Sequence, residues 1–235
     1  MKIVAVGPMH NEGARAAEVV RKFPQGWVHE IVVVNDASTD GGERQVAEAG
    51  ATVLSLKRRS GPGTAIRTGF DYGLEKGYDV FIVFATNGKD NPQEIPALLR
   101  PIQENRADFV QGSRYLEGGS WRNMPFHRVW GIPVFTSFFS LAAGRKITDG
   151  TNGFRAIRRS VLEDPRIDLR QEWLEGYPLE TYLFLQAIRL GHRVVEVPIT
   201  KMYPNSGTRY TKQKPLIDWW NYFKPIPYLT FRLKK

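Results

Sequence analysis

The sequence predicts an α/β fold with a mostly parallel central sheet flanked by helices. Short apolar runs alternate with helical patterns along the N-terminal half, which is the order of strand–helix–strand units with right-handed crossovers. Two of these runs, residues 31–34 and 80–84, break abruptly into polar loops that carry acids and amides. Because ligands of open α/β sheets bind outside the carboxyl ends of the strands, both loops are expected to meet at one crevice.

Each element is assigned from its hydrophobic pattern and its flanking residues. Buried strands are expected at residues 3–6, 31–34, 52–56 and 80–84. Helices are expected at residues 11–23, after the capping residues 38–40, at 64–76 and at 93–104, with Pro92 at a first helical position. Further along, strands are expected near 108–112, at 153–157 and at 193–197, and a helix at 179–190.

Length and composition favour one α/β domain with an appended tail. A chain of 235 residues with 42% hydrophobic content can bury one large core, which we place at residues 1–200, with halves at about 1–112 and 113–200. The absence of cysteine excludes disulfides and thiolate metal sites, and suits a cytoplasmic protein. No signal or transit peptide is expected, since Met1 is followed directly by a predicted strand.

The positive charge is concentrated at the C-terminal end. The net charge is +9, and residues 201–235 contribute +7 of it through eight Lys or Arg against Asp218. Aromatic residues lie between these cations, a combination that suits an anionic membrane surface. Nucleic-acid grooves use the same ingredients, although a nucleic-acid partner is not expected. The alternative is that the aromatics pack on the core. Prolines limit any helix in this tail to about residues 216–224.

Residues 129–144 form the longest nearly uncharged stretch. It is shorter than the roughly 18 to 20 apolar residues that a spanning helix needs, and no transmembrane segment is expected elsewhere. Two interpretations remain open, a helix in the membrane interface or an ordinary buried helix. The first is supported by the flanking cationic or titratable residues His127, Arg128, Arg145 and Lys146.

Six short motifs together resemble the family 2 inverting glycosyltransferases, in the branch of dolichyl-phosphate mannosyltransferase and bacterial polyprenyl-phosphate glycosyltransferases. They occupy residues 8–12 (PMHNE), 34–41 (VNDASTDG), 61–69 (GPGTAIRTG), 112–115 (GSRY), 149–155 (DGTNGFR) and 196–199 (EVPI). The resemblance covers about residues 3–200. It implies a Rossmann-like glycosyltransferase A fold, with a donor half at 1–112 that binds a GDP- or UDP-sugar and an acceptor half at 113–200.

The resemblance and the chemistry of the side chains indicate a set of donor-binding residues. Asp36 can accept a hydrogen bond from a ring N–H of uracil or guanine, and Glu12 can accept hydrogen bonds from ribose hydroxyls. Helix capping and turn formation are the alternative roles for Asn11, Asp36 and Asp40. The full set is Pro8, Asn11, Glu12, Asp36, Ser38, Gly61, Gly63, Arg67, Thr86, Asn87, Gly88 and Lys89.

The expected metal site departs from the family pattern. Relatives carry Asp-x-Asp after the fourth strand, where two carboxylates hold Mg²⁺ or Mn²⁺, and here the matching positions are Ala85 and Asn87. A divalent cation is therefore expected on Asn87 and Asp90, with weakened affinity. Alternatively, Lys89 neutralises the donor phosphates directly, or the segment simply forms turns.

On the acceptor side, Arg114 and Arg128 match arginines that the family places near the acceptor phosphate. Residues 205–212 resemble a flexible acceptor loop in which Arg209 and Lys212 reach phosphates; a solvated linker is the alternative. Asp149 and Glu180 match acids found in relatives. Each is a candidate general base for a hydroxyl acceptor. The alternative roles are capping of residues 150–152 and pairing with arginines such as Arg155. Asp90, Arg114, Asp149 and Glu180 thus form the candidate catalytic set.

The sequence therefore predicts an inverting glycosyltransferase that transfers sugar to a polyprenyl phosphate or related membrane acceptor. We expect it at the cytoplasmic face, bound peripherally through its tail or with a separate membrane subunit. Two alternatives remain: transfer to a soluble hydroxyl acceptor such as a glycan, which needs a general base, and a non-catalytic nucleotide-sugar-binding protein with a degenerate metal site.

Overall fold

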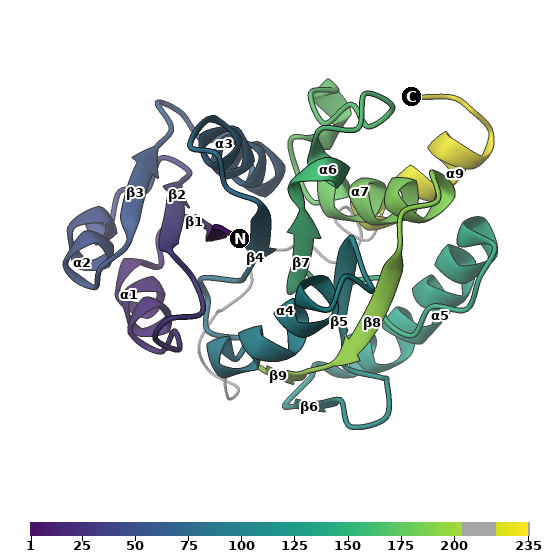
Figure 1. Ribbon diagram of the computed structural model, residues 1–235, viewed down its shortest axis with the longest axis horizontal. Coiled ribbons are helices and arrows are strands. Elements are labelled where there is room, and N and C mark those ends of the chain that lie inside the picture. Colours follow the sequence, from purple (N-terminus) through teal and green to yellow (C-terminus); the bar gives the residue numbers. More distant parts are fainter. Residues whose placement is uncertain (204–219, 235) are drawn as a thin grey trace.

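The computed structural model, which describes residues 1–203 and 220–234, places a seven-stranded sheet between helices (Figure 1). The sheet order is β3-β2-β1-β4-β7-β5-β8. Its strands are β1 (Ile3–Met9), β2 (Glu30–Asn35), β3 (Thr52–Ser55), β4 (Val80–Val83), β5 (Phe109–Ser113), β7 (Arg155–Arg158) and β8 (Val194–Pro198). The predicted fold class is confirmed.

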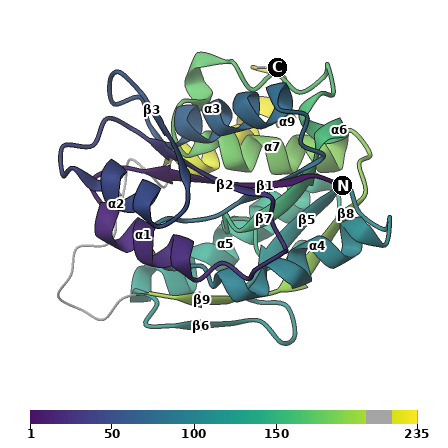
Figure 2. The same cartoon turned by 60° about the vertical axis from the view of Figure 1, so that its left-hand side comes forward.

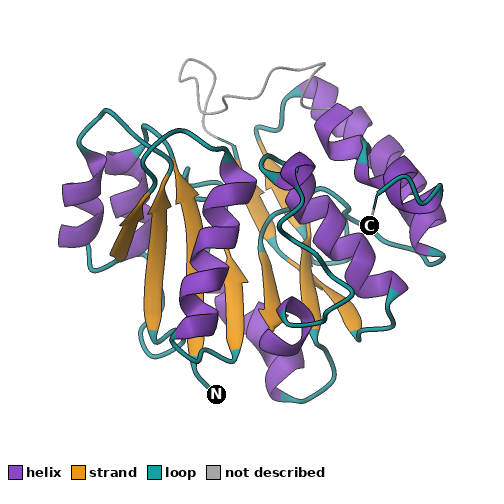
Figure 3. Cartoon of the chain, turned by 90° about the horizontal axis from the view of Figure 1, so that it is seen from above, coloured by secondary structure: helices purple, strands orange, loops and turns teal. Residues whose placement is uncertain are grey.

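The sheet is parallel except at β7, which is antiparallel to both β4 and β5. On the N-terminal side, β1 pairs in parallel with β2 and β4, and β2 with β3. The carboxyl ends of β1, β2 and β4 therefore open at the same edge, and the strands are seen side by side in Figure 3. The two acid-bearing loops follow β2 and β4 at this edge.

Two apolar cores lie on opposite faces of the sheet because successive strand side chains alternate. In β1, Val4 and Val6 belong to the core under α3 and α7, whereas Ile3 and Ala5 belong to the core under α1 and α4. Figure 2 shows these helices above and below the sheet. The helices of these layers are α1 (Gly13–Arg21), α2 (Gly42–Glu48), α3 (Pro62–Glu75), α4 (Ile95–Gln103), α6 (Arg159–Leu162) and α7 (Pro178–Arg189).

The uncharged stretch forms the helix α5 (Phe126–Ala143), which ends at Gly144 in the left-handed region with φ 66°. One side of α5 is buried, with Phe135 and Phe139 in the core beside α7. Its other side is exposed, so α5 is buried on one side only, and its place in a membrane interface stays a prediction. Within the described parts of the chain, no helix has both the length and the hydropathy that crossing a bilayer requires.

Several short elements were not predicted, among them α6. The helix expected at 93–104 begins as a 3₁₀ turn, η1 (Pro92–Glu94), before α4, and a second 3₁₀ turn, η2 (Glu172–Leu174), precedes α7. A separate parallel pair joins β6 (Ser120–Arg122) to β9 (Thr200–Met202). The expected boundary between residues 200 and 201 thus falls inside β9.

The described part of the tail packs on the domain. In α9 (Pro225–Thr230), Ile226 and Leu229 are buried in the core under α7. The Tyr228 ring lies 5.1 Å from that of Trp173 in an edge-to-face arrangement. Packing on the core, the alternative raised for the tail aromatics, therefore describes this segment. The limit of any tail helix to about residues 216–224 is wrong, because α9 begins at Pro225, and proline is tolerated in a first helical turn. Most of the helix expected at 216–224 lies outside the described residues.

Candidate active site

A cavity of about 460 Å³ opens at the carboxyl ends of β1, β2 and β4. Its walls come from the loops after these strands, from the N-terminus of α1, and from the acceptor half. This is the crevice that the two polar loops predicted. The cationic side chains that line it are Arg15, Arg59, Lys89, Arg114, Arg128 and Lys201.

Asp36 lies in the cavity wall at the end of β2, with 4% of its surface exposed. Its two carboxylate oxygens accept hydrogen bonds from the backbone N–H groups of Ser60 and Gly61, at 2.6 and 2.9 Å. Gly61 has φ 94°, a conformation that other residues rarely adopt. Since a carboxylate has about four acceptor positions, Asp36 can hold this loop and still accept a hydrogen bond from a ligand.

Asn11 and Glu12 also line the cavity, and both are held by the neighbouring loops. The Asn11 backbone N–H donates to Ser38 Oγ at 2.9 Å, and the Asn11 side-chain oxygen accepts from the Thr39 N–H at 2.7 Å. The Thr86 hydroxyl lies 2.7 Å from the Glu12 carboxylate and also contacts the Pro8 carbonyl. Hydrogen bonds therefore lock the loops after β1, β2 and β4 together.

Asp40 and Ser38 also form hydrogen bonds that connect these loops. The Asp40 carboxylate accepts hydrogen bonds from the N–H groups of Gly13 and Gly42, the first residues of α1 and α2, at 3.0 and 3.1 Å. This is the capping role considered for Asp40. Ser38 is not part of the cavity wall, and its hydroxyl is the acceptor for Asn11.

Gly63 and Arg67 do not line the cavity, although the sequence predicted donor contacts for both. A Cβ atom on Gly63 would lie 2.1 Å from the Leu174 carbonyl oxygen, so glycine permits α3 to touch that backbone. The Arg67 guanidinium donates to the Leu169 carbonyl at 2.9 Å. In this structure both residues fix α3 against residues 169–176, and a donor contact for either stays a prediction.

The loop after β4 brings a lysine, and not a carboxylate pair, into the cavity. Lys89 is 8% exposed, and burial, together with Lys201 and Arg128, lowers the pKa of its ammonium group to about 7. The Asn87 side-chain oxygen accepts a hydrogen bond from the Lys89 backbone N–H at 3.3 Å. Gly88, with φ 77°, permits this tight turn.

Asp90 forms a buried ion pair with Lys201. One carboxylate oxygen lies 2.6 Å from the Lys201 ammonium nitrogen, and the other accepts a hydrogen bond from the Ala85 N–H at 2.8 Å. The same ammonium group donates to the Asn152 side-chain oxygen at 2.7 Å. Lys201 was not predicted as a site residue, because the sequence pattern assigned it to the tail.

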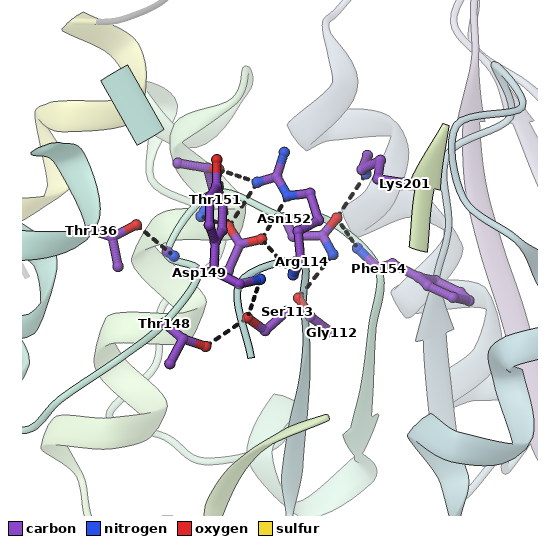
Figure 4. A network of polar contacts seen from close by, with 12 residues as sticks. Gly112, Ser113, Arg114, Thr136, Thr148, Asp149, Thr151, Asn152, Phe154 and Lys201 are labelled. Carbon is purple, nitrogen blue, oxygen red and sulfur yellow. Dashed lines mark hydrogen bonds and ion pairs between the residues drawn. The ribbon is translucent and has the colours of Figure 1, made fainter. Parts of the chain in front are cut away.

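Arg114 and Asp149 form a bidentate ion pair (Figure 4). The Arg114 Nε and Nη2 atoms lie 2.6 and 2.7 Å from the two Asp149 oxygens, and Nη2 also donates to Thr151 Oγ1 at 2.6 Å. Asp149 has no exposed surface. Burial alone would raise the pKa of Asp149, but the Arg114 guanidinium and several hydrogen bonds outweigh it and lower that pKa.

This environment makes Asp149 a poor general base, because a lowered pKa and occupied oxygens disfavour taking a proton. Its position instead suits orienting Arg114, which lines the cavity. The Arg114 Nη1 atom donates to the Tyr203 hydroxyl at 2.8 Å. Tyr203, like Lys201, was missed at the sequence level: a strand as short as β9 leaves no hydrophobic periodicity to detect.

Tyr203 contacts three cationic side chains. Besides its bond with Arg114, its ring centre lies 5.8 Å from the Lys89 ammonium and 5.9 Å from the Arg128 guanidinium carbon. Arg128 belongs to the first turn of α5 and lines the cavity. The structure therefore brings Arg114 and Arg128 to one wall, and their contact with an acceptor phosphate stays a prediction. Arg209 and Lys212 lie outside the described residues.

Glu180, in the first turn of α7, also reaches the cavity. Its Oε1 atom lies 3.7 Å from Nη2 of the buried Arg155, whose Nη1 atom donates to the Glu180 carbonyl at 2.8 Å. The Arg155 guanidinium carbon lies 5.7 Å from the Phe109 ring centre and 5.9 Å from the Phe184 ring centre. Pairing with Arg155, one of the two roles considered for Glu180, is present.

Comparison with known proteins identifies the family. The glycosyl transferase family 2 model matches residues 5–165. The polyprenol monophosphomannose synthase of Mycolicibacterium smegmatis is 35% identical over 209 residues, which is 85% of this chain and 77% of that protein. The chain belongs to glycosyl transferase family 2. A second family 2 relative, the undecaprenyl-phosphate mannosyltransferase of Micrococcus luteus, is 35% identical over 85% of this chain and 83% of its own length.

Solved structures show the same fold as this glycosyltransferase. The glucosyl-3-phosphoglycerate synthase of Mycobacterium tuberculosis in complex with UDP superposes with a TM-score of 0.70 at 19% identity, covering 98% of this chain and 80% of that one. The same enzyme with Mn²⁺, UDP-glucose and phosphoglyceric acid gives a TM-score of 0.69 at 21% identity, covering 98% and 79%. At this identity the likeness shows the fold alone, the glycosyltransferase A fold.

The residues of this glycosyltransferase do not fit a divalent cation at the predicted position. Ala85 has no side-chain ligand atom, and the buried Asp90 carboxylate is paired with the Lys201 ammonium, which opposes a second cation there. Among residues 1–203 and 220–234, no group of three or more His, Cys, Asp or Glu side chains is arranged to hold a metal. In this structure Asp90 is the partner of Lys201, and a cation on Asn87 and Asp90 stays a prediction that this ion pair opposes.

Proposed function

We propose that this glycosyltransferase moves a sugar from a nucleoside-diphosphate donor onto the phosphate of a polyprenyl phosphate at a membrane surface. The observation that carries the proposal is the wall of the cavity, where Lys89, Arg114 and Arg128 converge on Tyr203. A cleft lined by cationic side chains concentrates positive potential and attracts anions. The donor diphosphate and the acceptor phosphate are both such anions.

The donor half suits the nucleoside. Asp36 and Glu12 line the cavity on the side of β1 and β2, and each carboxylate keeps acceptor capacity after its hydrogen bonds to the protein. We assign Asp36 to the base and Glu12 to the ribose. The diphosphate then extends toward the loop after β4 and Lys89. Guanine and uracil both carry a ring N–H that Asp36 can bind, and we assign the donor as a GDP- or UDP-sugar.

The exposed side of α5 supports a lipid acceptor. Five large apolar side chains point to solvent on this helix, at spacings of three or four residues that place them along one face. They are Phe126, Trp130, Val134, Phe138 and Leu141, with exposures from 50% to 81%. A contiguous apolar face of this kind marks an interaction site.

The position of α5 links this apolar face to the cavity. Arg128 lies in the same helix, between the exposed residues Phe126 and Trp130 in the sequence, and it lines the cavity. A polyprenyl phosphate can therefore place its phosphate at Arg128 while its chain lies along α5 in the lipid. The two relatives at 35% identity are named for polyprenol and undecaprenyl-phosphate acceptors, in accord with this assignment.

The reaction is a single displacement with inversion. A phosphate oxygen of the acceptor forms a bond to the anomeric carbon as the bond from that carbon to the diphosphate breaks, and the electron pair leaves with the nucleoside diphosphate. A phosphate monoester is largely ionised near neutral pH, so no base has to remove a proton. The cations of the cavity stabilise the charge on the departing diphosphate.

A transfer assay tests this proposal. The purified chain is incubated with a panel of GDP- and UDP-sugars and with either a polyprenyl phosphate, the matching polyprenol without phosphate, or a soluble oligosaccharide. We expect a glycosylated lipid phosphate, identified by mass spectrometry, and no product from the alcohol. Transfer to the oligosaccharide but not to the lipid phosphate would overturn the acceptor assignment.

A further inference from the structure

The part of the cavity nearest the β4 loop, where the sequence predicted a metal site, is lined by the ammonium groups of Lys89 and Lys201. We propose that the ammonium groups of Lys89 and Lys201 replace a divalent cation in this enzyme, so that donor binding and transfer need no metal. This inference rests on the proposed function, since it concerns how the donor diphosphate is neutralised.

Backbone pairing brings the two lysines to the same wall. The Met202 N–H donates to the Lys89 carbonyl at 2.9 Å, and Asp90 forms an isolated antiparallel bridge with Lys201. The loop after β4 and strand β9 therefore run beside each other, although they are far apart in sequence. This pairing places Lys201 next to the site where the sequence predicted a metal.

Lys201 is held in place by its partners. Its ammonium group donates to Asp90 at 2.6 Å and to Asn152 at 2.7 Å, while the side chain is 10% exposed and lines the cavity. An ammonium group has three donors, so two such bonds leave one N–H for a phosphate oxygen. Fixed cations of this kind stabilise a leaving group without reorganising as the bond breaks.

The local charge disfavours a metal ion. The charged groups that act most strongly on the Lys89 ammonium are Lys201, Arg128, Asp90 and Glu12. With the protonated form of Lys89, three cations face two carboxylates, and one of those carboxylates is paired with Lys201. The pKa of Lys89 is lowered to about 7, and an entering diphosphate favours its protonated form. A divalent cation would enter a region that is already positive, where Coulomb repulsion opposes it. A diphosphate entering the same region is attracted.

The first experiment uses the unaltered protein. Thermal stabilisation by UDP and by GDP is measured with excess EDTA and, separately, with Mg²⁺ or Mn²⁺, because a ligand that binds the folded state raises its midpoint. We expect the same stabilisation with EDTA as with either metal. Stabilisation that appears only with metal would overturn the inference while leaving the proposed function intact. No stabilisation by any nucleotide under either condition would refute the proposed function instead.

The second experiment separates the diphosphate from the nucleoside. In Lys89→Met, the affinity for the nucleoside diphosphate should fall roughly tenfold or more, the loss of one charge-assisted hydrogen bond. The affinity for the corresponding nucleoside, which has no phosphate, should stay unchanged. The matched control is Lys146→Met, which removes an exposed lysine outside the cavity wall and should alter neither affinity.

Two results of the variant series would count against the inference. One is that, with EDTA present for both proteins, Lys89→Met binds the nucleoside diphosphate as tightly as the unaltered protein does. The other is that the diphosphate affinity of Lys89→Met and of Lys146→Met falls equally. Because Lys201→Met leaves Asp90 without its partner and can impair folding, the EDTA comparison on the unaltered protein remains the decisive measurement.

Discussion

Lys201 and Asp90, 111 residues apart in sequence, form an ion pair with 2.6 Å between the ammonium nitrogen and a carboxylate oxygen. The Asp90 side chain is 1% exposed and that of Lys201 is 10% exposed. The pair ties β9 to the loop after β4 and thereby joins the last strand of the described domain to the donor cavity. A position that the sequence assigned to metal binding thus serves to fix a cation.

The first prediction concerns the stability that this pair provides. Lys201→Met should lower the free energy of unfolding by about 3–5 kcal/mol, because it leaves the Asp90 carboxylate buried without a cation. The double variant Asp90→Asn/Lys201→Met should lose less than the sum of the two single variants. Urea unfolding of all four proteins measures this coupling as a double-mutant cycle. Single losses that simply add would show that the two side chains do not stabilise each other.

Much of the donor half could be predicted from sequence because its signals are local. The apolar run that forms β2 and the polar residues that follow it locate Asp36 at a strand end, where the structure places it. Asn11 and Glu12 follow β1 in the same way. The role of Arg67 could not be predicted, since its partner Leu169 is 102 residues away and no local pattern indicates that contact.

The second prediction is a pH dependence of stability that comes from Asp149. Its folded-state pKa lies below the ordinary value of 3.8, because Arg114 and hydrogen bonds outweigh the effect of burial. In acid, the unfolded state therefore binds more protons than the folded state. The stability that the pair contributes is fully present above about pH 4 and is lost as the pH falls through the folded-state pKa.

Asp149→Asn removes this titration. Its free energy of unfolding should be lower than that of the unaltered protein near neutral pH, and it should fall less between about pH 6 and about pH 3. The control Phe139→Leu removes buried core volume but keeps the ion pair, so it should show the full acid-dependent loss. Equal acid-dependent losses in Asp149→Asn and in the control would contradict the assignment.

The acceptor half was harder to predict because its contacts join distant segments. The motif that contains Arg114 and the one that contains Asp149 were both detected, but not that they bind each other. Tyr203 and Lys201 had been placed in the tail, since the short strand β9 resembles the residues around it. Side chains that depend on long-range pairing of short elements carry no sequence signal of their own.

The third prediction concerns the apolar face of α5. Phe126→Ser/Trp130→Ser should weaken binding to lipid vesicles roughly tenfold or more, since each large apolar side chain contributes about 1.5–3 kcal/mol when it leaves water. The control is Ile132→Val on the buried side of the same helix, which should bind vesicles normally. Co-sedimentation with vesicles measures both. Unchanged binding in the double variant would show that α5 does not contact the lipid.

The fourth prediction distinguishes a lipid phosphate from a hydroxyl acceptor through Glu180. This carboxylate reaches the cavity beside Arg155 and is the remaining candidate base, because Asp149 is fully buried against Arg114. If the acceptor is a phosphate, no proton has to be removed, so Glu180→Gln should transfer sugar at nearly the unaltered kcat. A hydroxyl acceptor would need the base, and kcat would then fall by about 10²–10⁴.

The pH dependence of kcat with the polyprenyl phosphate, measured across about pH 6 to 8, gives a second criterion. The acceptor phosphate itself titrates near pH 6, so no further change in kcat caused by titration of a carboxylate is expected above that pH. A large loss of kcat in Glu180→Gln, measured at saturating substrate, would show that the acceptor must be deprotonated. That result would favour the glycan alternative.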